Sequence, residues 1–150
     1  MSEHPLAVDL PMLVAGFREA CARFYAAQIQ LEHDKGFPAL FECVAWAGAV
    51  RDRLRADQKP VPEVIDGLWF IRNLVVHLGV DAISRSVVLS TYGGGMYGEG
   101  TYGGESREEW QWVARAQLPK PESTRGLHQY DAKLAGRSVS ATLQEASQGL

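Results

Sequence analysis

An apolar stretch in the middle of the chain, residues 62–79, constrains the fold more than any other segment. Its sequence, PEVIDGLWFIRNLVVHLG, places apolar side chains on almost every side of the expected helix. A helix with this pattern is enclosed by other helices, because a surface helix shows a broad polar face. The sequence therefore predicts a mainly α-helical bundle in which residues 62–79 form the central helix.

Four polar residues interrupt this apolar stretch, namely Asp66, Arg72, Asn73 and His77. At about 100° per residue, Asp66, Asn73 and His77 share one stripe of the helix, and Arg72 projects from its flank. A buried polar group costs free energy unless another group pairs with it. These side chains therefore form either a structural network or a site in which an imidazole transfers protons and a guanidinium binds phosphate.

The segment RNLVVH, residues 72–77, resembles the signature of the HEPN superfamily of helical-bundle proteins. That signature has an Arg, often followed by Asn, Asp or His, and then a His a few residues later on a core helix. The resemblance covers roughly residues 10–80. It implies an antiparallel bundle that dimerises through its motif helix, here residues 62–79.

The same resemblance implies an RNA-binding, metal-independent endoribonuclease that uses no cofactor. Arg72, Asn73 and His77 match the motif and are the expected catalytic residues. The family also suggests a toxin or anti-phage role, in which a protein antitoxin or regulator is a further partner. Some members lack activity, so a catalytically silent, dimeric interaction module is the alternative.

Composition and charge fit one soluble globular domain. The 150 residues are 46% hydrophobic and 22% charged, which is enough apolar material for a full core. The expected organisation is a set of core helices over 10–80, a β-hairpin over 84–118 and C-terminal helices over 126–150. A net charge of −3 excludes a protein that coats nucleic acid non-specifically, so any RNA contact is expected to be local.

The sequence shows no targeting signal, and no run approaches the roughly 18–20 apolar residues of a membrane span. We therefore expect a cytoplasmic protein without a membrane partner. The two cysteines, Cys21 and Cys43, lie on expected apolar helix faces and are interpreted as buried thiols. The four histidines lack the spacing of metal ligands, so no metal site is predicted.

Two helices are expected before the central one. The first begins at an Asp9 N-cap and ends around Lys35–Gly36, and Pro38 opens the second, which buries Phe41 and runs to about residue 56. Arginines gather at the end of this second helix. They either complement the helix dipole or, at Arg51 and Arg55, contact an RNA backbone.

The chain beyond residue 80 changes character. Residues 84–92 and 109–119 have the composition of short strands, and we expect them to form a hairpin. The glycine-rich tract between them carries Tyr92, Tyr97 and Tyr102, which either stack on RNA bases or pack onto the domain. A third alternative is a small-ligand or nucleotide sensor that uses this tract as a lid. Two helices, over 127–135 and from Ser138 or Ser140 onward, should complete the bundle.

Overall fold

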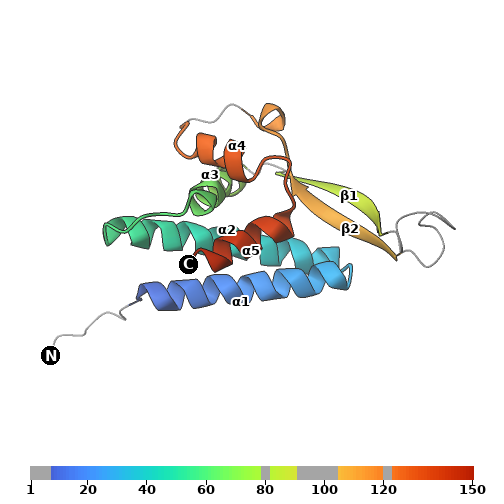
Figure 1. Cartoon of the computed structure of the whole chain (residues 1–150), viewed down its shortest axis with the longest axis horizontal. Coiled ribbons are helices and arrows are strands. Elements are labelled where there is room, and N and C mark those ends of the chain that lie inside the picture. The colour runs from blue at the N-terminus through green and yellow to red at the C-terminus, as the bar shows by residue number, and fades with distance from the viewer. Residues whose placement is uncertain (1–7, 79–81, 91–104, 120–122) are drawn as a thin grey trace.

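The structure is a computed structural model that describes residues 8–78, 82–90, 105–119 and 123–150. This part of the chain is mainly helical, with one two-stranded antiparallel sheet (Figure 1), and both features confirm the sequence prediction. The elements, in chain order, are α1 (Leu10–Ile29), α2 (His33–Ala56), α3 (Glu63–Leu78), β1 (Ile83–Ser90), β2 (Glu105–Trp112), the 3-10 helix η1 (Arg115–Gln117), α4 (Leu127–Lys133) and α5 (Val139–Gln148).

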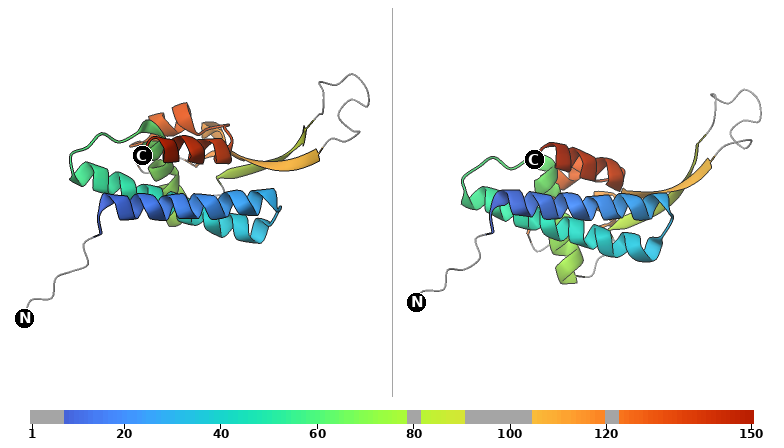
Figure 2. Two further views of the ribbon diagram at one scale, coloured as in Figure 1. Left: turned by 60° about the horizontal axis from the view of Figure 1, so that its bottom comes forward. Right: turned by 90° about the horizontal axis from the view of Figure 1, so that it is seen from below.

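Helices α1 and α2 form a long antiparallel pair that lies side by side along most of its length (Figure 2). The start of α1 follows its capping chemistry, because a carboxylate oxygen of Asp9 accepts a hydrogen bond from the Met12 amide at 3.0 Å. Pro11 occupies the first turn, where a missing backbone N–H costs nothing. The predicted beginning of the first helix is therefore confirmed.

The predicted end of the first helix is wrong. Helix α1 ends at Ile29 rather than at Lys35–Gly36, and the chain reverses through Leu31 with φ +55°. The Glu32 amide donates to the Ala27 carbonyl at 2.9 Å, which closes the helix end well before the expected glycine. The misplacement arose because Leu31 continues the apolar spacing of α1 although its side chain is outside the helix.

The following helix consequently starts earlier than predicted. Helix α2 begins at His33, so Pro38 lies inside it rather than at its start. Gly36 is a packing residue and not a helix cap, because a β-carbon there would lie 3.3 Å from the ring of Trp110. Phe41 was expected in the core but is 40% exposed, because it lies at the edge of the α1–α2 contact and lines an open hollow there.

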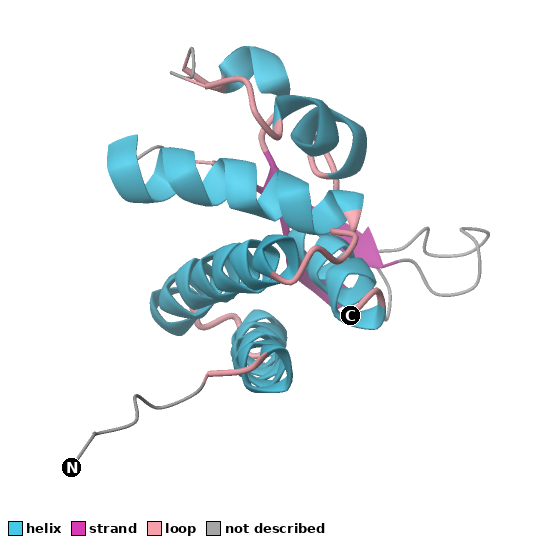
Figure 3. Cartoon of the chain, turned by 90° about the vertical axis from the view of Figure 1, so that its left-hand side faces the viewer, coloured by secondary structure: helices cyan, strands magenta, loops and turns pink. Residues whose placement is uncertain are grey.

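Helix α3 runs across the α1–α2 pair, and α1, α2, α3 and α4 stack in this order from bottom to top in Figures 1 and 3. Neighbours on α2, α4 and α5 cover it. Gly67 permits the close approach of α4, because a β-carbon there would lie 2.5 Å from Leu134 Cδ1 and 3.3 Å from the Gln129 carbonyl oxygen. The central position predicted for this helix is confirmed over residues 63–75, and Gly79 lies outside the described residues.

The covering of α3 bears on the dimer predicted through residues 62–79. That prediction assumed that two neighbouring helices leave apolar surface on the central helix. Helix α4 supplies a third neighbour, and none of the exposed large hydrophobic side chains in the described part of the chain lies on α3. The side chains of residues 76–78 are outside the description. Over residues 63–75 the apolar argument for a dimer therefore does not hold.

The β-hairpin extends away from the helices (Figure 1). Strands β1 and β2 pair antiparallel, with Ile83 opposite Trp112 and Arg85 opposite Trp110. Trp110 and Trp112 share one face of β2 and are both buried against the helical core. The second strand occupies residues 105–112 rather than 109–119. It ends at Trp112, and the chain then forms the 3-10 helix η1.

Hydrogen bonds link the C-terminal helical region to the end of β2. The Gly136 amide donates to the Trp112 carbonyl at 2.8 Å, and the Tyr130 hydroxyl donates to the Val113 carbonyl at 2.6 Å. The Ser138 hydroxyl caps α5, as predicted, by accepting from the Ala141 amide at 3.3 Å. Among the helices of the described residues, none has the length and apolar character to cross a membrane.

Candidate functional site

Helix α3 carries all three residues of the predicted catalytic motif. Arg72 and Asn73 are adjacent on it and half-buried. His77 follows five residues later on the same helix, and its side chain lies outside the described part of the structure. The structure therefore places the motif on one continuous helix, at the end that leads into the sheet.

The Arg72 side chain lies across α2 at Gly48. A β-carbon on Gly48 would lie 2.6 Å from Arg72 Cδ, 3.0 Å from Nε and 3.1 Å from Nη1. Gly48 is itself buried, so the Arg72 side chain packs directly against the backbone of α2 at a residue without a side chain. Only glycine leaves room for this path, because real β-carbon contacts are almost never shorter than 3.0 Å.

The Arg72 guanidinium has no acidic partner among the residues that the structure describes. None of them forms an ion pair or a hydrogen bond with its side chain. Half-buried arginines are usually paired, because removing a cation from water costs free energy. An unpaired guanidinium of this kind presents two parallel N–H donors to an incoming phosphate.

Asp66, the acidic residue of the polar stripe on α3, pairs with a second arginine, Arg51. Arg51 of α2 donates from Nε to Asp66 at 3.2 Å and from Nη1 to Asp52 at 3.3 Å. Its guanidinium also lies 3.8 Å from the ring centroid of Trp69, which is a cation–π contact. Asp66 therefore neutralises Arg51 and is not the partner of Arg72.

This network gives Arg51 a structural position rather than a surface one. Only 6% of Arg51 is exposed, whereas an RNA backbone needs a cation that it can reach. This arrangement differs from both alternatives given for the arginines at the end of α2, since Arg51 is neither a solvated group at the helix end nor open to an RNA backbone. Its role is to hold α2 against α3 beside the motif residues.

Arg55, the other predicted RNA contact on α2, is exposed. It lines an open polar hollow of about 520 Å³ together with Lys59, Gln58, Val61 and Asp66. Within the described residues neither Arg55 nor Lys59 forms an ion pair. These two cations therefore remain available to a polyanion at the end of α2.

The remaining sequence candidates are three tyrosines of the glycine-rich tract and two cysteines. Tyr92, Tyr97 and Tyr102 lie in residues 91–104, outside the described residues. Cys21 and Cys43 are buried free thiols, as predicted. A hydrogen bond with Cys21, and then burial, raise the pKa of the Cys43 thiol well above its ordinary value, so this thiol stays protonated and unreactive.

Sequence reasoning missed the two contacts that define this region, Gly48 with Arg72 and Arg51 with Asp66. Both join α2 to α3, and which residues of two helices meet depends on where the helices cross. One signal was present: Gly48 lies in the small-residue run Ala47–Ala49, which permits close helix contact.

Comparison of the chain with models of protein families, with curated proteins and with solved structures gives no match. Among the described residues, no group of three or more His, Cys, Asp or Glu side chains is placed to hold a metal ion. The function is therefore inferred from the residues and geometry of the chain itself.

Proposed function

We propose that the chain is an RNA-binding, metal-independent endoribonuclease of the HEPN type. The observation that carries this proposal is the half-buried guanidinium of Arg72, which has no ion-pair partner among the residues that the structure describes and lies next to Asn73 on the helix that carries His77. A structural arginine is expected to have a carboxylate partner, as Arg51 does. Arg72 has the character of a phosphate-binding group.

The proposed chemistry uses the RNA 2′-hydroxyl as the nucleophile. His77 removes the 2′-hydroxyl proton or donates a proton to the departing 5′-oxygen, and Arg72 neutralises the charge on the scissile phosphate. The 2′-oxygen bonds to phosphorus as the bond to the 5′-oxygen breaks. The products are a 2′,3′-cyclic phosphate and a 5′-hydroxyl, and Asn73 orients one of the reacting groups.

Arg55 and Lys59 supply a second contact in this proposal. Their side chains border the polar hollow at the end of α2, and each can neutralise one phosphate of a bound strand. Because the protein has a net charge of −3, binding should depend on these few cations rather than on a broad basic surface. The salt dependence of RNA affinity is therefore expected to be shallow.

The direct test is incubation of the purified protein with a mixture of structured and single-stranded RNAs in EDTA. We expect fragments that end in a 2′,3′-cyclic phosphate, and no cleavage of DNA of the same sequences. Arg72→Ala should reduce the rate by about 10² to 10³, the cost of losing one donor to a developing anion. Arg53→Ala, which removes an exposed arginine paired with Asp57, is the matched control and should cleave normally.

Two outcomes would count against the ribonuclease. Equal cleavage by the wild type and Arg72→Ala would identify a contaminating nuclease. A wild-type protein that cleaves none of the RNAs would favour the silent interaction module. A toxin or anti-phage role, which the resemblance implies, predicts growth arrest on expression of the wild type and normal growth with Arg72→Ala.

A substitution at Gly48 tests the position of Arg72 without removing its charge. Gly48→Ala should lower RNA cleavage by at least tenfold, because the new methyl group displaces the arginine, and a shift of about 1 Å can cost up to 10²-fold. Gly16→Ala is the control, because it introduces a similar close contact inside α1, away from Arg72. Its β-carbon would lie 2.7 Å from the Trp46 ring. Equal activity losses in variants of equal thermal stability would show that Gly48 does not position Arg72.

A further inference from the structure

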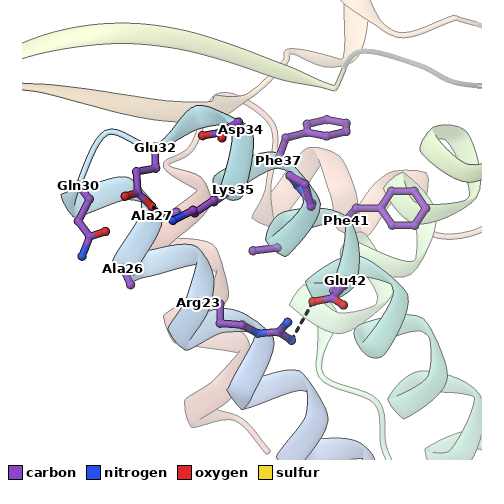
Figure 4. A pocket seen from close by; sticks show the side chains of 12 residues that line it. Arg23, Ala26, Ala27, Gln30, Glu32, Asp34, Lys35, Phe37, Phe41 and Glu42 are labelled. Atoms are coloured by element: carbon purple, nitrogen blue, oxygen red, sulfur yellow. Dashed lines mark ion pairs between the residues drawn. The ribbon is translucent and has the colours of Figure 1, made fainter.

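An open groove of about 800 Å³ lies between the end of α1 and the start of α2 (Figure 4). Small side chains form part of its lining, among them Ala26, Ala27 and Ala39. Phe37 and Phe41, one helical turn apart on α2, also border it. The groove is thus a hollow over small residues with large aromatic side chains beside it.

Two lining residues of this groove, Phe37 and Phe41, are exposed, and two more exposed apolar residues lie in the adjoining stretch of chain. Among the residues whose exposure the structure describes, six large hydrophobic residues are exposed, and four of them lie between the last residue of α1 and the first turns of α2. Their exposed fractions are 83% for Ile29, 53% for Leu31, 54% for Phe37 and 40% for Phe41. Single exposed hydrophobics are ordinary, but four of them within one helix–turn–helix segment indicate an interaction surface.

Leu31 is unusual in a second, independent way. It occupies the left-handed position after α1, with φ +55°, where its amide donates to Gln28 and the next amide donates to Ala27. Glycine fits this position without strain, whereas a branched side chain is strained there. Gln58 holds the equivalent position after α2 with φ +56°, but its side chain is polar. A strained and exposed leucine is costly to the isolated chain, which points to a contact that uses it.

The charges around the groove restrict the kind of partner. Arg23 pairs with Glu42 at 2.8 Å, as the dashed line in Figure 4 marks, and Lys35 pairs with Glu32 at 3.2 Å. Arg23 and Lys35, the cations among the described lining residues, are therefore already neutralised and attract a nucleic-acid backbone only weakly. A near-neutral surface with both signs on its rim is complementary to itself under a two-fold rotation.

We propose that this groove is an interface between two copies of the chain. Ile29 and Leu31 flank Gln30, which lines the hollow, so a two-fold interface centred on the groove brings these two side chains close to the hollow of the other copy. In the dimer, Ile29 and Leu31 of one copy pack against Phe37 and Phe41 of the other. The rim ion pairs can be exchanged between copies without a net loss of charge pairing.

The available area is of the right size for such a dimer. If a large apolar side chain presents about 200 Å², burying the exposed parts of these four removes roughly 400 Å² of apolar surface per copy. A standard interface buries about 800 Å² per partner, of which somewhat more than half is apolar. The inference goes beyond the proposed function, because it places self-association away from the motif on α3.

Sedimentation equilibrium of the RNA-free protein, from micromolar to hundreds of micromolar, tests the proposal. The wild type should show a monomer–dimer equilibrium, and Ile29→Gln and Leu31→Gly should each weaken dimerisation at least tenfold. Leu31→Gly should not harm the monomer, since glycine suits that backbone position. Gln58→Gly makes the same backbone change after α2 and should leave the dimer unchanged.

Two results would overturn the proposal. A wild type that stays monomeric throughout this range would mean that a second copy does not occupy the groove, and a different protein partner would become the candidate. A dimer that both variants leave intact would place self-association elsewhere, such as residues 62–79. Neither result depends on RNA cleavage, so the ribonuclease and the interface are tested separately.

Discussion

Replacement of His77 by alanine is expected to lower the rate of RNA cleavage by about 10² to 10⁴, the range for loss of a general acid or base. The residue lies one and a half turns after Arg72 on α3, and its imidazole is the group in the RNLVVH motif suited to proton transfer near neutral pH. Arg72 remains in place in this variant, so RNA affinity should change much less than the rate. A loss that appears only in affinity would contradict an acid–base role.

The matched control for this experiment is His128→Ala. His128 lies exposed on α4, and its removal should leave cleavage unchanged. Circular dichroism and thermal unfolding of both variants should match the wild type. If His128→Ala loses as much activity as His77→Ala, the proton-transfer group has been assigned to the wrong residue.

Replacement of Asp66 by alanine is expected to lower the free energy of unfolding by about 3 kcal/mol, the low end for removing one partner of a buried ion pair. The Arg51 side chain is only 7% exposed and the Asp66 side chain 20%, so the guanidinium would be left without its buried counter-charge. Its cation–π contact with Trp69 does not replace an anion. Chemical denaturation at neutral pH measures the change.

Asp52 provides the control, because it contacts the same guanidinium from the surface. Its carboxylate lies 3.3 Å from Arg51 Nη1, but its side chain is 58% exposed. Solvent screens such a contact, so Asp52→Ala should cost well under 1 kcal/mol. If both variants lost the same stability, Asp66 would have no special part in holding α2 against α3.

The elements that could be predicted from the sequence are those set by local chemistry. Asp9 and Ser138 are capping residues whose side chains accept amide hydrogen bonds within the next turn, and each begins its helix as expected. The apolar run of α3 likewise determines its buried position without knowledge of its neighbours. Local patterns are sufficient here because the interacting groups are close in the sequence.

The end of α1 could not be predicted because two local signals were misleading. Leu31 extends the apolar spacing of the helix, and Gly36 has the composition of a helix cap. In the structure Leu31 ends the helix despite its branched side chain, and Gly36 packs beneath Trp110, a residue far away in sequence. A contact of that range leaves no mark in a window of neighbouring residues.

The candidate site could be predicted only in part for the same reason. The sequence placed Arg72 and Asn73 on the central helix, which is where they lie. It did not distinguish Arg51 from Arg55, although one is buried against Trp69 and the other is exposed. The difference arises from the crossing of α2 and α3, which sets the side of α2 that each arginine occupies.

The contact between α1 and α5 has a consequence for synthesis of the chain. The Arg18 guanidinium donates to the Ser147 carbonyl oxygen at 3.1 Å, across 129 residues of sequence. At about 5–20 residues per second, a ribosome needs roughly ten seconds to produce the second partner after the first. During that interval α1 and α2 can pair, but the side of α1 that α5 covers stays open to water and to chaperones. The contact between α1 and α5 therefore forms only after α5 has been synthesised.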